Sequence, residues 1–304
     1  MGEHQQRAAS CRRKVEILIY LKLLLMAVFW GGTFIAGRGI SQQVGPFSAA
    51  FLRFSVATVC LLLIASRSGQ RLTLPQRRHL LPLALLGLTG VFSYNYFFFK
   101  GLKLIEAGRA SIIIATNPVF IALFASLIFR ERLNAARLLG ICLSVSGAIV
   151  VITKGHPSTI LSGNLGWGEL FIFCCVASWV TYALLGKAVM ADLSPLTAVT
   201  YSSVIGTCFL LFPAIREGLL SNWPYSLSVW GNAAYLGFFG TVIGFVWFYQ
   251  GIQKIGPTKA GLFINFVPIS AVIMAYLILD EPITWSLMVG VVLVSLGVYL
   301  TNRK

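Results

Sequence analysis

Aromatic and hydroxyl side chains recur at matching places in two apolar stretches of this sequence. Trp30 and Thr33 lie three residues apart, which places them on one face of a helix. Trp179 and Tyr182 hold the same places 149 residues later. Tryptophan usually favours the headgroup region of a membrane, but Trp30 follows Ile17 by 13 residues, or about 20 Å of helix. We therefore expect these side chains to line a cavity wall, with protein packing or the outer aromatic belt as the alternative.

Amide side chains also lie inside apolar stretches, at Asn95, Asn117, Gln250 and Asn265. A buried amide needs hydrogen-bond partners, so these residues either bond between helices or line a wet cavity near the middle of the membrane. Tyr94 and Trp247 lie beside two of them. A cavity with aromatic walls and a few amides suits a small amphipathic or zwitterionic metabolite.

Two prolines interrupt long apolar stretches at equivalent places, Pro118 and Pro268. Each proline removes one backbone donor and clashes with the preceding turn. We expect each to kink its helix and to free a carbonyl group near the middle of the membrane. Because the two prolines match in position, we predict a role in gating, with a simple packing kink as the alternative.

Charged residues inside or beside these stretches are few. Arg53 lies six residues inside an apolar run, about 9 Å from its end. We expect its side chain to snorkel to the outer surface, with contact to an anion as the alternative. Glu131 and Glu281 precede two helices for which Asn134 and Thr284 are expected N-caps, and we interpret both glutamates as structural turn residues stabilised by a helix dipole.

The nine acidic residues and three histidines fall in tails, loops or first helical turns. No carboxylate or imidazole is therefore expected in the middle of a span. This counts against proton-coupled drug pumps that use a membrane-buried glutamate, and against intramembrane hydrolases, which need an Asp, His or metal cluster. A Walker A motif is also missing from the sequence. We predict no catalytic residues, no metal site and no cofactor, so the chain is not expected to be an enzyme.

The composition indicates the elements that carry these residues. Of the 304 residues, 57% are hydrophobic and 11% are charged, with a mean hydropathy of +0.83. A soluble globular protein is excluded, because its apolar core would lack a polar surface to cover it. The apolar runs span roughly 17–37, 47–66, 80–99, 108–129, 136–153, 165–185, 196–215, 231–251, 258–279 and 283–301. Their lengths and the lack of alternation predict an all-α integral membrane protein with ten transmembrane helices.

The distribution of Lys and Arg predicts the orientation of these spans. If the N-terminus is inside, 17 of the 24 basic residues lie in inner segments. Inner loops usually carry the excess of positive charge. Ten spans return the C-terminus to the same side, so both termini are predicted to be cytoplasmic. We interpret the net charge of +15 as basic loops that face anionic lipid, and not as a nucleic-acid-binding surface.

The sequence repeats itself with a period near 150 residues. Residues 87–152 and 237–302 share 15 identities in 66 positions, among them the paired prolines, the paired glutamates and several glycines. The predicted units are a basic tail (1–16), a first repeat (17–153) and a second repeat (165–304). Each repeat holds five helices, an odd number, so the second half enters the membrane from the opposite side. Inverted repeats of this kind are typical of secondary transporters.

Several motifs resemble the drug/metabolite transporter superfamily, in its ten-helix EamA-type branch. They include AVFWGGTF (27–34), FLRFSVAT (51–58), and the long stretches 101–151 and 251–300, each with a central proline, a glutamate turn and a glycine-rich last helix. The resemblance covers nearly the whole chain. It implies an inner-membrane metabolite transporter, often an exporter of amino acids or related compounds, without naming one substrate.

These observations together predict a multi-pass transporter of the inner cell membrane that exports a small metabolite by alternating access. Its expected partners are that small molecule and the lipid bilayer, with a homodimer as one open arrangement. An aromatic-cation or drug efflux pump is the first alternative. A membrane-embedded enzyme and a scaffold that does not transport are alternatives from other classes.

Overall fold

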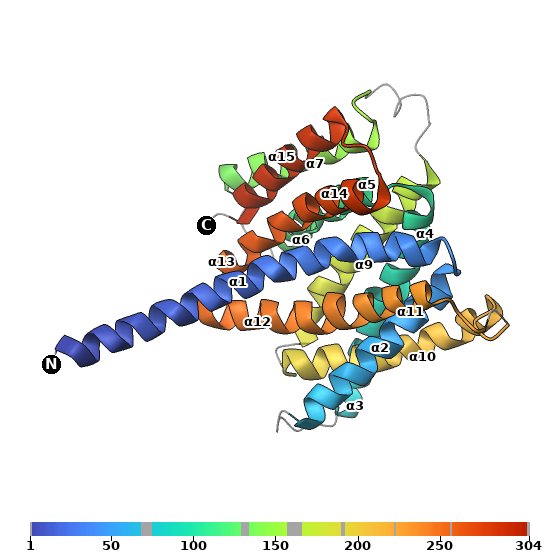
Figure 1. Ribbon diagram of the computed structural model, residues 1–304, viewed down its shortest axis with the longest axis horizontal. Helices are drawn as coiled ribbons and strands as arrows, with labels where there is room; N and C mark the ends of the chain where they lie inside the picture. The colour runs from blue at the N-terminus through green and yellow to red at the C-terminus, as the bar shows by residue number, and fades with distance from the viewer. Residues whose placement is uncertain are drawn as a thin grey trace.

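The computed structural model describes residues 2–67, 75–128, 134–156, 166–189, 192–221, 223–255 and 257–302, and these ranges contain helices and no strands (Figure 1). The first half comprises α1 (Gly2–Ser41), α2 (Pro46–Arg67), α3 (Arg77–Leu86), η1 (Gly87–Ser93), α4 (Tyr94–Leu104), α5 (Ala107–Ile114), α6 (Asn117–Ile128) and α7 (Ala135–Ile152). The second comprises α9 (Trp167–Val189), α10 (Pro195–Arg216), α11 (Leu227–Ala234), η2 (Tyr235–Ile243), α12 (Gly244–Ile255), α13 (Pro257–Leu262), η3 (Phe263–Asn265), α14 (Phe266–Leu279) and α15 (Trp285–Asn302).

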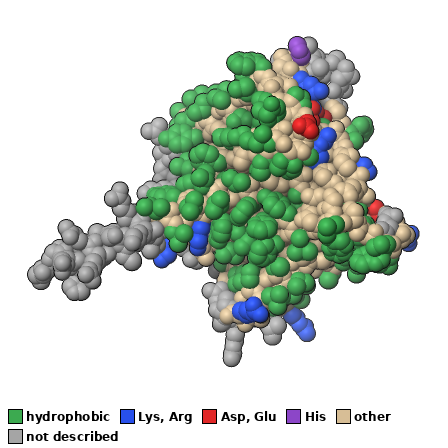
Figure 2. Space-filling model, in the orientation of Figure 1, with side chains coloured by type: hydrophobic (Ala, Val, Ile, Leu, Met, Phe, Trp, Pro, Cys, Tyr) green, Lys and Arg blue, Asp and Glu red, His purple; other side chains and the backbone are tan. Residues whose placement is uncertain are grey.

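The predicted membrane spans are confirmed as helices. Within the described ranges, nine helical segments are long and apolar enough to cross a membrane, and α15 adds a shorter apolar helix at 285–301. Several helices extend beyond the predicted bounds: α1 also includes residues 2–16, which were expected to form a tail. Figure 2 shows hydrophobic side chains over the visible face, with charged side chains gathered towards its edges. This distribution fits a protein whose sides contact lipid.

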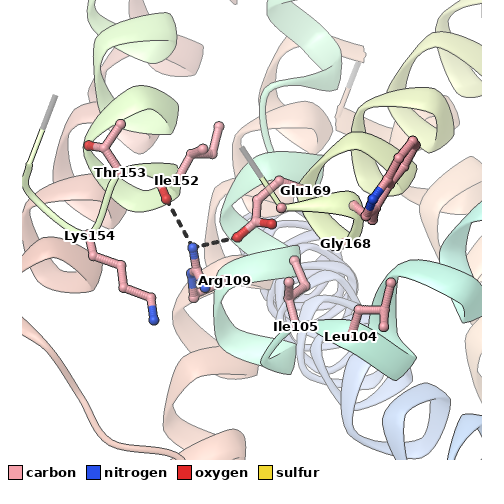
Figure 3. A pocket seen from close by; sticks show the side chains of 10 residues that line it. Leu104, Ile105, Arg109, Ile152, Thr153, Lys154, Gly168 and Glu169 are labelled. Atoms are coloured by element: carbon pink, nitrogen blue, oxygen red, sulfur yellow. Dashed lines mark hydrogen bonds and ion pairs between the residues drawn. The ribbon is translucent and has the colours of Figure 1, made fainter. Parts of the chain in front are cut away.

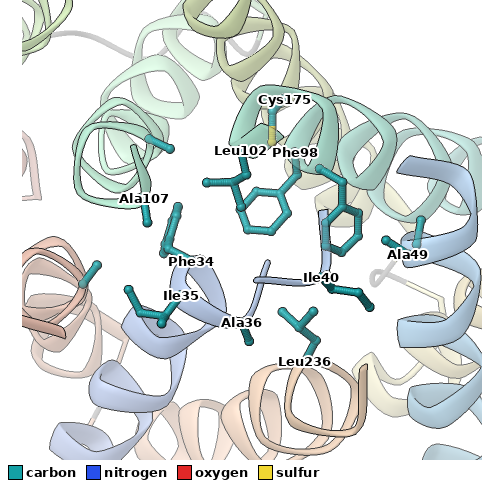
Figure 4. Packing of buried hydrophobic residues seen from close by; sticks show 14 of the residues in the cluster. Phe34, Ile35, Ala36, Ile40, Ala49, Phe98, Leu102, Ala107, Cys175 and Leu236 are labelled. Atoms are coloured by element: carbon teal, nitrogen blue, oxygen red, sulfur yellow. The ribbon is translucent and has the colours of Figure 1, made fainter. Parts of the chain in front are cut away.

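The helices lie side by side, so that the start of α1 and the end of α15 are at the same end of the bundle (Figure 1). We call the opposite end the distal end; there α1, α4, α7, α10 and α14 finish and α2, α5, α9, α11 and α15 begin. α1 runs through the interior. In Figure 4 its residues Phe34 and Ile40 lie between Phe98 and Leu102 of α4 and Leu236 of η2.

The two halves are related by an approximate two-fold axis. Thr58 of α2 and Thr207 of α10 are repeat mates 149 residues apart, and their hydroxyl oxygens are 3.1 Å from each other in a hydrogen bond. A residue can contact its own mate only near such an axis. The predicted inverted arrangement of two five-helix halves is therefore confirmed.

Glycines bring the last helices of the two halves, α7 and α15, into close backbone contact. A Cβ atom on Gly140 would lie 2.6 Å from the carbonyl oxygen of Gly297, and a Cβ atom on Gly297 would lie 2.6 Å from the oxygen of Gly140. Gly147 and Gly290 approach each other in the same way, with 3.3 Å between a Cβ on Gly290 and the Gly147 oxygen. Any larger residue would push these two backbones apart. We call these four residues the glycine seam.

Four spans are interrupted by non-α segments, at matching places in the two halves. η1 and η2 are π-helical and divide the third and eighth spans. The fourth span breaks at Ala115 and Thr116, just before Pro118, and the ninth passes through the 3-10 segment η3, just before Pro268. The α-helical pattern thus breaks two to five residues before each proline. Short π segments inside helices frequently mark functional sites, and these two were not predicted.

Candidate substrate site

A group of aromatic rings joins the two halves at the centre of the bundle. Trp30 of α1 lies 5.7 Å from Phe245 of α12, measured between ring centroids, and Trp179 of α9 lies 6.4 Å from the same ring. Tyr94 of α4 continues the group at 5.2 Å from Trp179. All four side chains are half-buried. We call these residues, together with Phe248 at 5.6 Å from Trp30, the central aromatic cluster.

The π-helical segments contact the two tryptophan helices, α1 and α9, at equivalent places. The Trp30 indole Nε1–H donates to the Gly240 carbonyl oxygen of η2 at 2.9 Å. The Thr33 methyl group packs on Gly240, and a Cβ atom added to Gly240 would lie only 2.5 Å from this methyl carbon. In the other half, the Tyr182 ring packs on Gly90 of η1 in the equivalent way. The predicted equivalence of the two tryptophan helices therefore extends to the segments they contact.

A buried arginine lies next to the cluster. The Arg53 side chain is only 8% exposed, and its Nη1 donates to Asn95 Oδ1 at 2.9 Å and its Nη2 to Thr241 Oγ1 at 3.4 Å. The expectation that Arg53 snorkels to the surface is wrong, because α2 faces the interior at this residue and polar side chains of α4 and η2 receive the guanidinium. Tyr94 and Cys175 lie close enough to interact with it electrostatically.

Asn95 and Thr241 owe their positions to the π-helical turns. Asn95 Nδ2 donates to the carbonyl oxygens of Gly90 at 3.3 Å and Val91 at 2.8 Å, and Thr241 Oγ1 donates to Leu236 O at 3.1 Å. These bonds satisfy backbone oxygens inside the wider turns. They also leave the Asn95 amide oxygen facing Arg53. Asn95 is 1% exposed, so it braces the site and does not line an open cavity.

Other predicted residues lie outside this cluster. The Gln250 amide oxygen accepts from Lys22 Nζ at 3.0 Å. Gln250 lies five residues before the end of α12, on the side of the bundle opposite the distal end. Trp247 packs on Phe29 at 5.6 Å, beside the cluster and not within it. Asn117 is 7% exposed, and its Oδ1 has no partner among the described residues.

The remaining predicted residues lie at the helix interruptions and in the turns. Pro118 and Pro268 follow the two breaks, and Asn265 is the last residue of η3. Glu131 lies outside the described residues. The expected N-caps form: Asn134 accepts from the Arg137 backbone N–H at 2.8 Å, and Thr284 accepts from that of Leu287 at 3.3 Å.

Glu281 closes the distal end by a contact that the sequence did not indicate. Its carboxylate accepts from the backbone N–H groups of Ala107 at 2.8 Å and Gly108 at 3.0 Å, at the start of α5. It also pairs with Arg38 Nε at 3.2 Å. Arg38 in turn donates to the carbonyl oxygens of Leu102 and Ile105. The helix dipole that Glu281 meets is that of α5 and not that of its own following helix. We call these contacts the distal clamp.

A cavity of about 450 Å³ also lies at the distal end, between the α4–α5 turn, the end of α7 and the start of α9. Figure 3 shows Arg109 between the Ile152 carbonyl oxygen, at 3.0 Å, and Glu169, at 2.6 Å. Arg109 and Glu169 are both buried. This cavity contains none of the predicted substrate-site residues, and its buried charges, Arg109 and Glu169, pair with each other. We therefore place the candidate site at the central aromatic cluster.

Sequence reasoning missed four residues of the central site: Phe245, Phe248, Cys175 and Thr241. A phenylalanine or cysteine in an apolar run gives no sign of which way its side chain points, so only the helix packing selects the first three. A signal for Thr241 was present, because it directly follows Gly240, the repeat mate of Gly90.

Two inverted five-helix halves with an aromatic and polar site at their interface define a polytopic membrane protein with the architecture of secondary transporters. Comparison with known proteins identifies the family. The chain belongs to the EamA-like transporter family, which matches it twice, over residues 17–153 and 166–303. It is therefore a multi-pass membrane transporter of this family.

Similar proteins cover nearly the whole chain. The uncharacterized transporter YyaM of Bacillus subtilis is 33% identical over 283 residues, which is 92% of both chains. A protein of Streptantibioticus cattleyicolor named a probable terminal-alkyne amino-acid exporter is 30% identical and covers 93% of this chain and 92% of its own. A solved crystal structure with 20% identity shares the fold, with a TM-score of 0.66 over 93% of this chain and 97% of that one.

Proposed function

We propose that this transporter exports amino acids or related small metabolites across the inner cell membrane by alternating access. One observation carries the proposal: the central aromatic cluster takes Trp30 from one half and its mate Trp179 from the other, and both contact Phe245. A substrate between these rings would touch both halves, so rocking of the halves would change its access from one side to the other.

The chemistry of the site supports a small amphipathic substrate. The rings offer apolar faces, while Arg53 and Asn95 supply polar groups beside them. The similarity to a protein named an amino-acid exporter supports the same class. An aromatic-cation pump fits less well, because the basic side chain buried beside the cluster, Arg53, is a cation and repels a cationic substrate.

The proposed orientation has both termini in the cytoplasm. It is supported by the bias of Lys and Arg and by the position of the start of α1 and the end of α15 at one end of the bundle (Figure 1). Fusing green fluorescent protein or periplasmic alkaline phosphatase to the C-terminus tests it. We expect fluorescence and no phosphatase activity, and the opposite pattern would reverse the assignment.

Export is tested in cells that overexpress the chain and are loaded with dipeptides that release single amino acids. We expect one class of amino acid to accumulate outside faster than in an empty-vector strain. Trp179→Ala should abolish most of this difference, while Trp285→Ala, at a side chain that is 78% exposed on the outside of the bundle, should retain it. No difference across the panel, with the protein confirmed in the membrane, would reject amino-acid export.

A further inference from the structure

Arg53 carries a positive charge into the centre of the bundle without a negative partner. No carboxylate among the described residues forms an ion pair with it, although the distal arginines Arg38 and Arg109 each have a glutamate. A buried charge without a counterion is costly in a membrane protein. Retaining it at a site where the two halves meet indicates that the charge is used by something that binds there.

The guanidinium has a donor left over. Nη1 and Nη2 bond to Asn95 and Thr241, while Nε is buried and has no partner in the described part of the chain. In arginine, Nε–H and one Nη–H lie parallel along one edge, which matches the two oxygens of a carboxylate. The Thr241 contact on Nη2 is long, at 3.4 Å, so this edge is the weakly satisfied one.

The surroundings hold this group ready for a ligand. Asn95 is fixed by its bonds to the η1 carbonyl oxygens, and it orients the guanidinium from one side. The rings of Phe54 and Phe98 lie 5.4 and 6.0 Å from the Arg53 Cζ atom. A group held in this way loses little entropy when it binds. The neighbouring Tyr94 and Trp179 continue from here into the central aromatic cluster.

The charge occurs only once in the two-fold arrangement. The repeat mate of Arg53 is Ser202, whose hydroxyl is buried and donates to the Val199 carbonyl oxygen at 3.1 Å. A ligand with one anionic group would therefore bind in a single orientation, with its anion towards α2 and its apolar body among the rings.

We propose that Arg53 binds the carboxylate of the transported molecule, so that the substrates are monocarboxylates with an apolar side group, such as amino acids or oxo acids. This proposal rests on the proposed function, because it deepens the description of the same site. Arg53 is enclosed in the present structure, so the rings must part before the ligand reaches it. Recognition depends on the carboxylate and does not require an ammonium group.

Calorimetric titration of the purified full chain in phosphatidylcholine nanodiscs tests this proposal. The probes are L-phenylalanine, 3-phenylpropionate and 2-phenylethylamine, with L-leucine, 4-methylpentanoate and 3-methylbutylamine as an aliphatic set. We expect the acids of at least one set to bind at least about tenfold more tightly than its amine, since hydrogen bonds to charged groups have that magnitude. Equal binding of amine and acid, or no binding of any acid, would overturn the proposal without the need for a variant.

Variants then assign the effect to Arg53. Arg53→Gln should weaken the binding of the acids about tenfold or more and leave the amine unchanged. Arg53→Lys keeps the charge but loses the two-donor edge, so it should bind the acids with an intermediate affinity. This variant provides the test if the glutamine variant does not fold. Arg67→Gln, at the exposed end of the same helix, is the matched control and should bind as the parent does. Unchanged acid binding in both Arg53 variants would overturn the proposal.

The outcomes also separate this proposal from the proposed function. Carboxylate binding that depends on Arg53, without export from cells, would reject the export function and keep the site. Export that persists in Arg53→Gln would reject the site and keep the transporter function. Binding of chloride that depends on Arg53, with no competition from either acid set, would overturn the assignment to a carboxylate.

Discussion

The distal clamp gives the clearest quantitative prediction. Glu281→Gln removes a charge that accepts two backbone hydrogen bonds, at 2.8 and 3.0 Å, and pairs with Arg38 at 3.2 Å. A hydrogen bond to a charged group contributes about 1.5–3 kcal/mol and a neutral one about 1 kcal/mol. Since two such bonds contribute about 3–6 kcal/mol and glutamine retains one neutral acceptor, we expect a loss of about 2–5 kcal/mol in the stability of the closed distal end. The loss of 2 kcal/mol alone corresponds to about a 30-fold shift towards an open distal end.

Cys175 reports such an opening. Its side chain is 0% exposed and lies beside Arg53 at the centre of the bundle. In a variant whose other five cysteines are replaced by serine, a membrane-impermeant maleimide applied to intact cells should react slowly with Cys175. Glu281→Gln should accelerate this reaction by about an order of magnitude or more, in line with the shift in the equilibrium.

Asp280→Asn is the matched control for this experiment. Asp280 is an exposed acid next to Glu281 with a φ of 55°, a conformation that asparagine also adopts readily. It should leave the labelling rate unchanged. If Glu281→Gln lowers the melting temperature but does not change the labelling of Cys175, the distal clamp braces the fold and does not control access. The reasoning given above would then be refuted.

Three further predictions follow from other features. Pro118→Ala and Pro268→Ala should reduce transport more than they reduce the amount of protein in the membrane, because each restores a backbone donor at an interruption. If transport and the amount on immunoblots fall equally, the prolines act in folding. Gly140→Leu should reduce the yield of folded protein in detergent, measured by size-exclusion chromatography, because it forces α7 away from α15. Gly261→Ala should leave this yield unchanged, since no atom lies within 4 Å of the added Cβ. Burial raises the pKa of the Tyr225 hydroxyl, which lies between α10 and α11 at the distal end. The stability that this group contributes is therefore retained below pH 10 and should fall as the pH rises through the raised pKa. Tyr225→Phe should remove this decline in thermal unfolding curves.

The sequence predicted the spans and their symmetry well because both depend on average properties. A span needs only length and apolarity, and the repeat needs only matched landmarks such as Trp30 and Trp179 or the two prolines. The bonding partners depended on details that composition does not contain. Arg53 was expected at the surface because the sequence does not show which face of α2 is buried. Gln250 was expected either to bond between helices or to line a wet cavity, and composition could not name its partner, Lys22 of α1.

The π-helical segments explain most of the remaining difference. Each one inserts an extra residue into a helical turn, so the face that a side chain occupies changes along the span. Asn95 and Thr241 point at Arg53 only because η1 and η2 precede or contain them. A regular helical periodicity applied to these spans therefore assigns the residues that follow each segment to the wrong neighbours.

The glycine seam has a consequence for the origin of the protein. Gly140 contacts Gly297 just as Gly147 contacts Gly290, and these residues are repeat mates at an offset of 150, so both halves use the same patch. Such a self-complementary interface would also join two identical copies of one half. Because α7 and α15 run in opposite directions across the membrane, the second copy would have to insert upside down. A half expressed on its own would therefore need nearly balanced Lys and Arg on its two sides to insert in both orientations, whereas in one chain each half can carry a charge bias of its own.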